Sequence, residues 1–257
     1  AFPAVRGEKP GIFEQRSSRT RTGPEQEGTA SMIQGIMETA FDAVYRATVI
    51  TLGILMIKNS KGRLQYLLFG VMAVTLGAGD AFHLVPRAYA LLTGGLEGHA
   101  AALGTGKFIT SITMTFFYLL LYHVWRARYK VRGGHQWTLA MYGLAAVRIA
   151  LCLFPQNQWT SPTPPLSWGI YRNIPFAIIG LIVILLFYRS ARERNDRPFR
   201  YMWLTIVLSF AFYIPVVLFA DSVPAVGILM IPKTIAYVWT VLIGYLDMRG
   251  QDKELQP

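Results

Sequence analysis

The residues that could do chemistry in this sequence are ionisable side chains inside its apolar segments. Each of seven apolar segments contains at least one of them, always in the half nearer the same side of the membrane that the segments are expected to cross. In chain order they are Asp42, Arg46, Asp80, Lys107, Arg148, Arg172, Asp221 and Lys233. A charge at bilayer depth costs about 2.5–3.5 kcal/mol even on a permissive scale, so such residues indicate a polar site. Seven segments contributing at one level predict one shared, one-sided pocket.

Cations outnumber acids in this predicted pocket. The cations are Arg46, Lys107, Arg148, Arg172 and Lys233, and the acids are Asp42, Asp80 and Asp221. If every acid pairs, about two cations stay uncompensated at low dielectric, which is costly unless an anion fills the site. The planar guanidinium of arginine suits carboxylate or phosphate recognition. The pattern therefore predicts an anion site, with Asn173 beside Arg172 as a further hydrogen-bonding group.

The same region could instead carry catalytic groups. Asp80 and His83 lie at positions i and i+3 of a predicted helix, where a carboxylate could orient an imidazole as an acid or base. Ser111 lies four residues after Lys107, and a serine–lysine nucleophile pair is permitted by that spacing. Tyr213, or an activated water, is another candidate nucleophile. Nearby cations would stabilise developing negative charge.

Structural roles compete with both chemical interpretations. Asp42 and Arg46 are spaced to neutralise each other along one helix face, and a salt-bridge network that locks the helices together would use the same residues. Ser111 could bond to the backbone, as serines in membrane helices commonly do. No metal site is predicted, because His83 and His99 lie near one membrane side and His123 and His135 near the other.

Composition places these residues in a helical membrane protein. Hydrophobic residues make up 53% of the chain and charged residues only 15%, which is typical of a polytopic membrane protein rather than a soluble domain. Each expected span has close to the roughly 20 residues that a bilayer requires. The spans are 36–57, 64–84, 102–124, 137–154, 168–188, 200–221 and 225–246, with Pro86 expected to end the second helix and residues 86–92 to form a short helix at the membrane surface.

The net charge of +11 is concentrated in three loops on one side. These loops carry Lys58, Lys61 and Arg63, then Arg126, Arg128, Lys130 and Arg132, then Arg189, Arg192, Arg194, Arg197 and Arg200. The positive-inside rule places them in the cytosol. We therefore expect the N-terminus outside, the C-terminus in the cytosol and an outward-facing pocket in a plasma or cell inner membrane. These loop charges are explained more simply by membrane topology and contact with anionic lipids than by a nucleic-acid partner, so no nucleic-acid partner is predicted.

Residues 1–31 differ from the rest of the chain. They are rich in Gly, Pro, Arg, Glu, Ser and Thr and contain no apolar stretch like that of a signal peptide. We expect this segment to be a disordered tail or an addition to the natural chain, followed by one seven-helix transmembrane domain over residues 32–257.

One family resemblance comes from the last two spans. A lysine on the seventh helix, Lys233, and the stretch Phe212-Tyr213-Ile214-Pro215 on the sixth resemble the retinal-binding rhodopsins, which implies a seven-helix bundle with an outside N-terminus. The detail departs from that family. Leu229 stands where the microbial members keep an aspartate, and the third helix offers Lys107 in place of a carboxylate counter-ion. No cofactor is predicted.

These patterns favour a receptor-like or sensor-like membrane protein. Its ligand would be an anionic small molecule or lipid headgroup, and a cytoplasmic partner could bind the basic loops. An intramembrane lipid-modifying hydrolase with its site in the outer leaflet is the first alternative. A transporter is the second, and it is weakened because the cytosolic halves of the spans carry no charged residue.

Overall fold

The structure is a computed structural model that describes residues 24–93, 97–220 and 222–254. This part of the chain contains seven long helices and no strand. The helices are α1 (Pro24–Lys58), α2 (Leu64–Leu92), α3 (Ala100–Arg128), α4 (His135–Leu153), α5 (Leu166–Glu193), α6 (Met202–Phe219) and α7 (Met230–Glu254), with short 3-10 helices η1 (Glu97–His99), η2 (Pro155–Asn157) and η3 (Pro224–Leu229) between them. All seven are long and apolar enough to cross a membrane. The prediction of an all-helical protein with seven helices able to span a membrane is confirmed.

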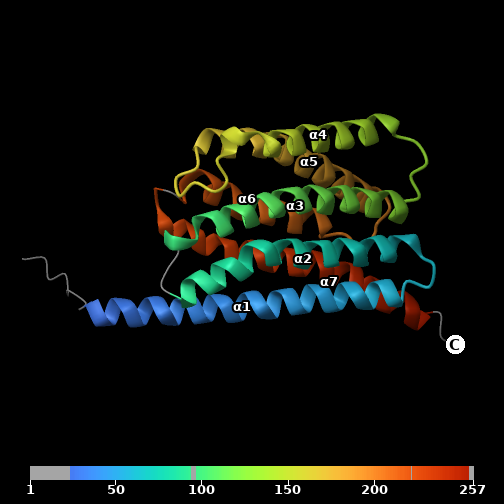
Figure 1. The fold of residues 1–257 in the computed structure, drawn as a ribbon. Coiled ribbons are helices and arrows are strands. Elements are labelled where there is room, and N and C mark those ends of the chain that lie inside the picture. The colour runs from blue at the N-terminus through green and yellow to red at the C-terminus, as the bar shows by residue number, and fades with distance from the viewer. Residues whose placement is uncertain (1–23, 94–96, 221, 255–257) are drawn as a thin grey trace, which may run out of the picture.

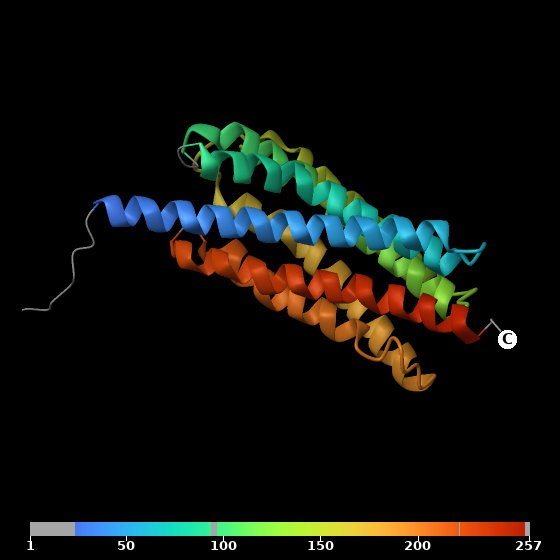
Figure 2. The ribbon, with the colours of Figure 1, turned by 90° about the horizontal axis from the view of Figure 1, so that it is seen from below.

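The helices form an up-and-down bundle in which chain neighbours pack side by side (Figure 1). Helix α1 also packs against α7, which closes the ring, while α3 additionally contacts α5 and α2 contacts α7. Figure 2 shows α1 and α7 running alongside each other, with the start of α1 projecting beyond the other helices. Helix α3 is the most enclosed of the seven, since half of the residues in its most apolar stretch are buried inside the bundle.

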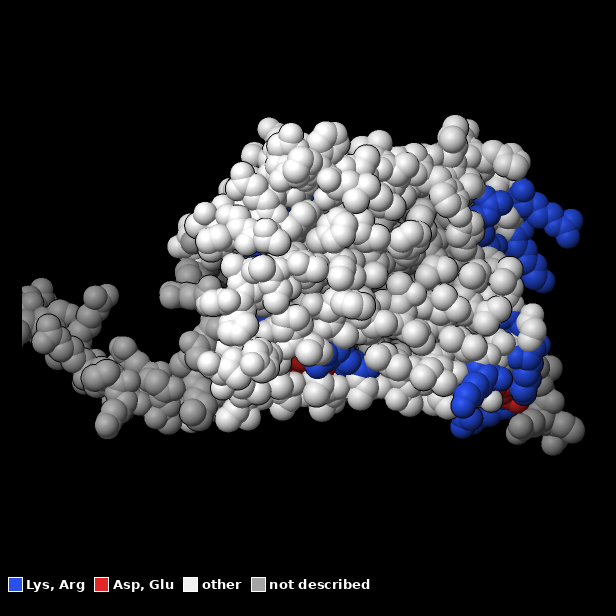
Figure 3. All heavy atoms as spheres, in the orientation of Figure 1, with Lys and Arg blue, Asp and Glu red and all other residues white. Residues whose placement is uncertain are grey.

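Lysine and arginine gather at one end of this bundle (Figure 3). That end, which we call the basic end, carries the connections 59–63, 129–134 and 194–201. The opposite end carries η1, η2 and η3. Those charged residues predicted to share a pocket that the structure describes lie in the half of the bundle nearer the opposite end.

Three helix boundaries differ from those expected from the sequence. Helix α1 begins at Pro24, inside the segment expected to be a tail, while residues 1–23 lie outside the described residues. Helix α2 continues through Pro86 to Leu92, so the expected end at Pro86 and the separate surface helix over 86–92 were wrong. A proline removes one backbone donor but does not end a helix whose neighbours support it. Helix α7 extends to Glu254, about two turns further than expected.

Glycines bring α1, α2 and α3 into close contact, as small residues commonly do between membrane helices. A Cβ atom on Gly77 would lie 2.6 Å from the Ile50 side chain of α1. One on Gly79 would lie 2.2 Å from the Thr113 hydroxyl of α3. One on Gly106 of α3 would lie 2.2 Å from the carbonyl oxygen of Phe82 of α2. These three helices are therefore fixed in register around the segment that carries Asp80 and His83.

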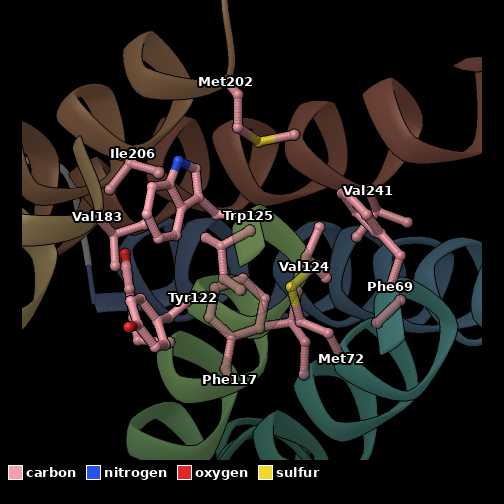
Figure 4. Close-up of a cluster of buried hydrophobic side chains, with 14 of the residues drawn as sticks. Phe69, Met72, Phe117, Tyr122, Val124, Trp125, Val183, Met202, Ile206 and Val241 are labelled. Carbon is pink, nitrogen blue, oxygen red and sulfur yellow. The ribbon is translucent and has the colours of Figure 1, made fainter. Parts of the chain in front are cut away.

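An apolar core fills the inside of the bundle, and Figure 4 shows a part of it. Phe69 and Met72 of α2, Phe117 and Trp125 of α3, and Val241 of α7 are among its buried members. Aromatic rings of this size bury a large apolar area, which is the main favourable contribution to packing. The same cluster continues toward the opposite end through Tyr118, Phe176 and Tyr237.

Arg128, the last residue of α3, joins four parts of the chain at the basic end. Its guanidinium donates to both oxygens of Asp196 at 2.9 and 2.8 Å, and to Asp247 of α7 at 2.5 Å. The Tyr66 hydroxyl of α2 donates to the same Asp247 oxygen at 2.6 Å. The guanidinium also lies over the Phe199 ring. Sequence analysis had assigned Arg128 only a topological role, so this fixed ion-pair network is a correction.

This ion-pair network shifts the pKa values of Asp196 and Tyr129. Burial alone would raise the pKa of Asp196, but the hydrogen bonds and charge of Arg128 outweigh burial and hold that pKa below its ordinary value of 3.8. Burial, together with the nearby Asp196 carboxylate, raises the pKa of the Tyr129 phenol. Asp196 is therefore ionised, and Tyr129 neutral, across the physiological pH range.

Helix packing at Gly106 predicts opposite effects for two glycine-to-alanine changes. Gly106→Ala should destabilise the protein by about 1–3 kcal/mol, because the new methyl group collides with the α2 backbone. Gly143→Ala, in an open position on α4, should be neutral or stabilise by about 0.5–1 kcal/mol, because alanine favours helix. Thermal unfolding in a neutral detergent measures both. Equal behaviour of the two variants would contradict the packing.

The pKa of Asp196 predicts how stability depends on pH. A carboxyl with a lowered native pKa stabilises the fold above its unfolded-state pKa and loses that contribution as pH falls through the native value. Asp196→Asn should therefore unfold at a lower temperature than wild type at pH 7, with a difference that shrinks below about pH 4. Glu193→Gln, which alters an exposed carboxylate, is the control and should show no such trend. A gap that stays constant down to pH 3 would refute the ion pair.

Candidate functional site

Asp80 of α2 is the carboxylate around which three helices meet. The Tyr45 hydroxyl of α1 donates a hydrogen bond to its Oδ2 atom at 2.8 Å. Lys233 of α7 and Arg46 of α1 lie close enough to interact with it electrostatically. The sequence placed Asp80, Arg46 and Lys233 in one site, but it did not point to Tyr45. The one indication of Tyr45 was its position one turn after Asp42 on the same helix face.

The ammonium group of Lys233 lies between two aromatic faces. Its Nζ atom is 5.1 Å from the ring centroid of Tyr213 on α6 and 5.2 Å from that of Tyr237, one turn further along α7. The residue is only 8% exposed. Cation–π contacts of this kind offset part of the cost of desolvation, and Asp80 supplies the opposite charge. Lys233 is therefore buried but electrostatically compensated.

Arg148 of α4 is the most deeply buried charged residue of the described chain, at 2% exposed. Its guanidinium carbon lies 3.4 Å from the ring centroid of Phe176 on α5. Tyr118, Tyr213 and Tyr237 surround it closely enough to interact electrostatically. Its Nε and Nη1 atoms have no hydrogen-bond partner among the described residues, and no described carboxylate lies within ion-pair distance of it.

Arg148 and Lys233 belong to one site, because they share Tyr213 and Tyr237 as neighbours. Aromatic rings complete the surroundings of Arg148. Phe176 packs against Tyr118 and Phe210 with centroids 5.1 Å apart in each case. Among the polar groups, the Tyr118 hydroxyl lies 3.3 Å from the Ser209 hydroxyl. This aromatic enclosure was not predicted, because aromatic residues are too common in apolar helices to single out.

Asp42 and Arg46 of α1 do not form the side-chain ion pair that their spacing predicted. Arg46 donates from Nε to the backbone carbonyl of Asp42 at 3.1 Å, rather than to its carboxylate. The two side chains still interact electrostatically. Glu38 and Arg87 form an ion pair between α1 and α2 nearby. These contacts support the structural interpretation of this part of the cluster.

Arg172 and Asn173 anchor the connection between α4 and α5. Arg172 donates to the Asn157 side chain at 2.8 Å and lies 4.2 Å from the Trp159 ring centroid. Asn157 is fully buried and donates in turn to the Leu151 and Phe154 carbonyls. Asn173 accepts a hydrogen bond from the Tyr213 hydroxyl at 3.2 Å. Arg172 therefore has a polar partner as well as an aromatic one, whereas the Nε and Nη1 atoms of Arg148 have no hydrogen-bond partner among the described residues.

The groups expected to form a catalytic set are not assembled. The Ser111 hydroxyl donates to the Lys107 carbonyl at 2.8 Å, and Lys107 is exposed on α3. Within the described residues no hydrogen bond joins Asp80 to His83, whose Nδ1 atom is buried without a partner. Asp221 lies outside the described residues.

Arg148 and Lys233 are buried inside the bundle, at 2% and 8% exposed. Two surface hollows lie at the basic end. One is bordered by Arg192, Arg197, Arg200 and Trp203, and the other by Arg128, Asp247 and Glu254. A ligand of Arg148 would therefore have to move side chains to reach it.

No model of a known protein family matches this chain, and no curated protein or solved structure matches it either. The resemblance to the retinal-binding rhodopsins gains no support from these comparisons.

The Asp80–Lys233 interaction predicts non-additive effects on stability. Asp80→Asn leaves the Lys233 ammonium uncompensated, and Lys233→Met leaves the carboxylate uncompensated, so each single change should destabilise the protein. The double variant should be less destabilised than the sum of the two by about 0.5–3 kcal/mol. Thermal unfolding of the four proteins of this cycle measures the coupling. Additive losses would show that the two groups do not interact.

Proposed function

We propose that this protein is a receptor-like or sensor-like protein of the plasma or cell inner membrane that binds an anion at Arg148. The seven apolar helices support residence in a membrane. The concentration of Lys and Arg at one end supports a cytosolic basic end, with the N-terminus outside. In this orientation the cluster of Asp80, Arg148 and Lys233 lies in the outer half of the membrane.

The observation that carries the proposal is the uncompensated guanidinium of Arg148. A buried charge normally has an opposite charge or a full set of hydrogen bonds, because its desolvation costs several kcal/mol. Here the Nε and Nη1 atoms have no hydrogen-bond partner within the described residues, and the ionisable groups that interact with the guanidinium are tyrosines and Cys152 rather than an acid. Phe176 covers one face of the guanidinium and cannot satisfy those donors. An anion bound at these donors would supply both the charge and the acceptors.

The other charged residues fit a supporting role. Asp42 with Arg46, Glu38 with Arg87, and Asp80 with Lys233 compensate one another between α1, α2 and α7. They hold the helices in place around the site. The geometry gives less support to the lipid hydrolase, because the Ser111 hydroxyl is committed to a backbone carbonyl.

Removal of the Arg148 charge should abolish ligand retention without unfolding the protein. Arg148→Met has a similar length and no charge, so the empty variant should be at least as stable as empty wild type, by up to about 4 kcal/mol. Native mass spectrometry of protein purified in a neutral detergent should show a retained anionic mass in wild type and none in Arg148→Met.

Arg132→Ala is the matched control, because Arg132 is exposed beyond the basic end of α3. It should retain the ligand as wild type does. Arg128→Ala is unsuitable for this purpose, since Arg128 joins Asp196 and Asp247. A mass retained equally by wild type, Arg148→Met and Arg132→Ala, or absent from all three, would contradict the proposal.

A further inference from the structure

The charge balance around Arg148 limits the charge of its ligand. Lys233 is compensated by Asp80, and Arg46 by Asp42. Arg172 is held by Asn157 and Trp159 near the end of the bundle. Lys107 is exposed and does not contribute to the enclosed site. Among the buried cations of the described residues, Arg148 is thus the one without an opposite charge, and Arg172 is partly exposed. A monoanion would neutralise Arg148, and a dianion would exceed its charge.

The supply of hydrogen-bond donors limits the number of acceptor atoms in the ligand. Arg148 offers its Nε and Nη1 atoms. The neighbouring hydroxyls are engaged, since Tyr118 bonds with Ser209 and Tyr213 donates to Asn173. A phosphate or sulfate brings four oxygen atoms, most of which would lose water without gaining a donor, and each such loss is costly. A carboxylate brings only two, so fewer of its oxygen atoms would be left without a donor.

The walls of the site favour an apolar group next to the anionic one. The rings of Phe176, Phe210 and Tyr118 lie in contact with one another beside the guanidinium, and Tyr213 and Tyr237 lie on the side of Lys233. An aliphatic or aromatic body would bury its surface against these rings. A small hydrated anion would gain nothing from them.

A hydrogen bond lies on the way from the opposite end to the site. Tyr213 of α6 donates to Asn173 of α5, one helical turn before Phe176. Both residues are partly exposed.

We propose that the ligand is a carboxylate monoanion with an apolar body, whose carboxylate accepts hydrogen bonds at one edge of the Arg148 guanidinium and whose body lies against Phe176, Phe210 and Tyr118. This inference rests on the proposed function and narrows it from anions in general to amphiphilic carboxylates. A long-chain acid from the bilayer and a smaller aromatic acid from solution share this chemistry.

A series of probes separates the requirements for charge and apolar body. Dodecanoate has both, acetate only the charge, dodecanol only the chain, and inorganic phosphate a second charge without a chain. Benzoate, which is short and aromatic, distinguishes an aromatic acid from a fatty acid. Each is titrated into wild type, Arg148→Met and Arg132→Ala in a neutral detergent, and the midpoint of thermal unfolding is recorded.

Dodecanoate or benzoate should raise the midpoint of wild type and Arg132→Ala, with half of the effect reached at a concentration at least about tenfold below that for acetate. Dodecanol and phosphate should not raise it, and Arg148→Met should respond to none of the probes. The wild-type series is decisive by itself if Arg148→Met does not fold.

Two outcomes would overturn the inference in different ways. If acetate or phosphate stabilises wild type as effectively as dodecanoate and benzoate, and Arg148→Met loses that effect, the site binds anions without an apolar body and only the narrower inference fails. If no anion stabilises wild type, or Arg148→Met responds as wild type does, the anion site at Arg148 fails as well.

Discussion

Burying a charged side chain among apolar helices costs several kcal/mol unless a partner compensates it, and this cost shapes both ends of the bundle. At the basic end the cost is met by direct ion pairs, since Arg128 contacts Asp196 and Asp247. In the opposite half it is met through looser electrostatic pairs and aromatic faces around Asp80 and Lys233. Arg148 is the exception, because it has an aromatic face but no described acid.

The Phe176 contact explains why the fold tolerates Arg148 without a ligand. A cation–π contact in a desolvated setting contributes about 2 kcal/mol, which offsets part of the cost of burial. The surrounding tyrosines add their dipoles. The remaining cost is the free energy that an anion can recover on binding. A site of this kind weakens the empty protein in order to bind its ligand, so its stability and its function oppose each other at one residue.

The sequence predicted the helices well and the partners of the charged residues only in part. Length and apolar composition sufficed for seven spans, because a membrane-crossing helix needs a continuous apolar stretch whatever its neighbours are. The run of α2 through Pro86 was missed, because its support comes from other helices. Gly77 and Gly79 are small residues of the kind that permit close helix approach, and the structure places α1 and α3 against them.

Which residues a charged side chain contacts depends on the rotation and register of its helix. Neither can be predicted from the residue pattern of a single sequence. Arg148 stood out by depth alone, since it lies far from either end of its span. Lys107 and Ser111 were grouped with it by level in the membrane, but α3 turns Lys107 outward. Conversely, Asp247 lay just past the expected end of the last span, so its ion pair with Arg128 was missed.

Helices α3 and α7 connect the two charged regions. Tyr118 of α3 and Tyr237 of α7 lie beside Arg148, and the same two helices meet at the basic end through Arg128 and Asp247. Between these points Phe117 of α3 packs on Tyr237 of α7, with ring centroids 5.6 Å apart. Helices transmit displacement along their length because packed cores resist gradual deformation. A ligand that separated Tyr118 from Tyr237 would therefore strain the Arg128–Asp247 ion pair, so a ligand at Arg148 would have a physical route to the basic loops.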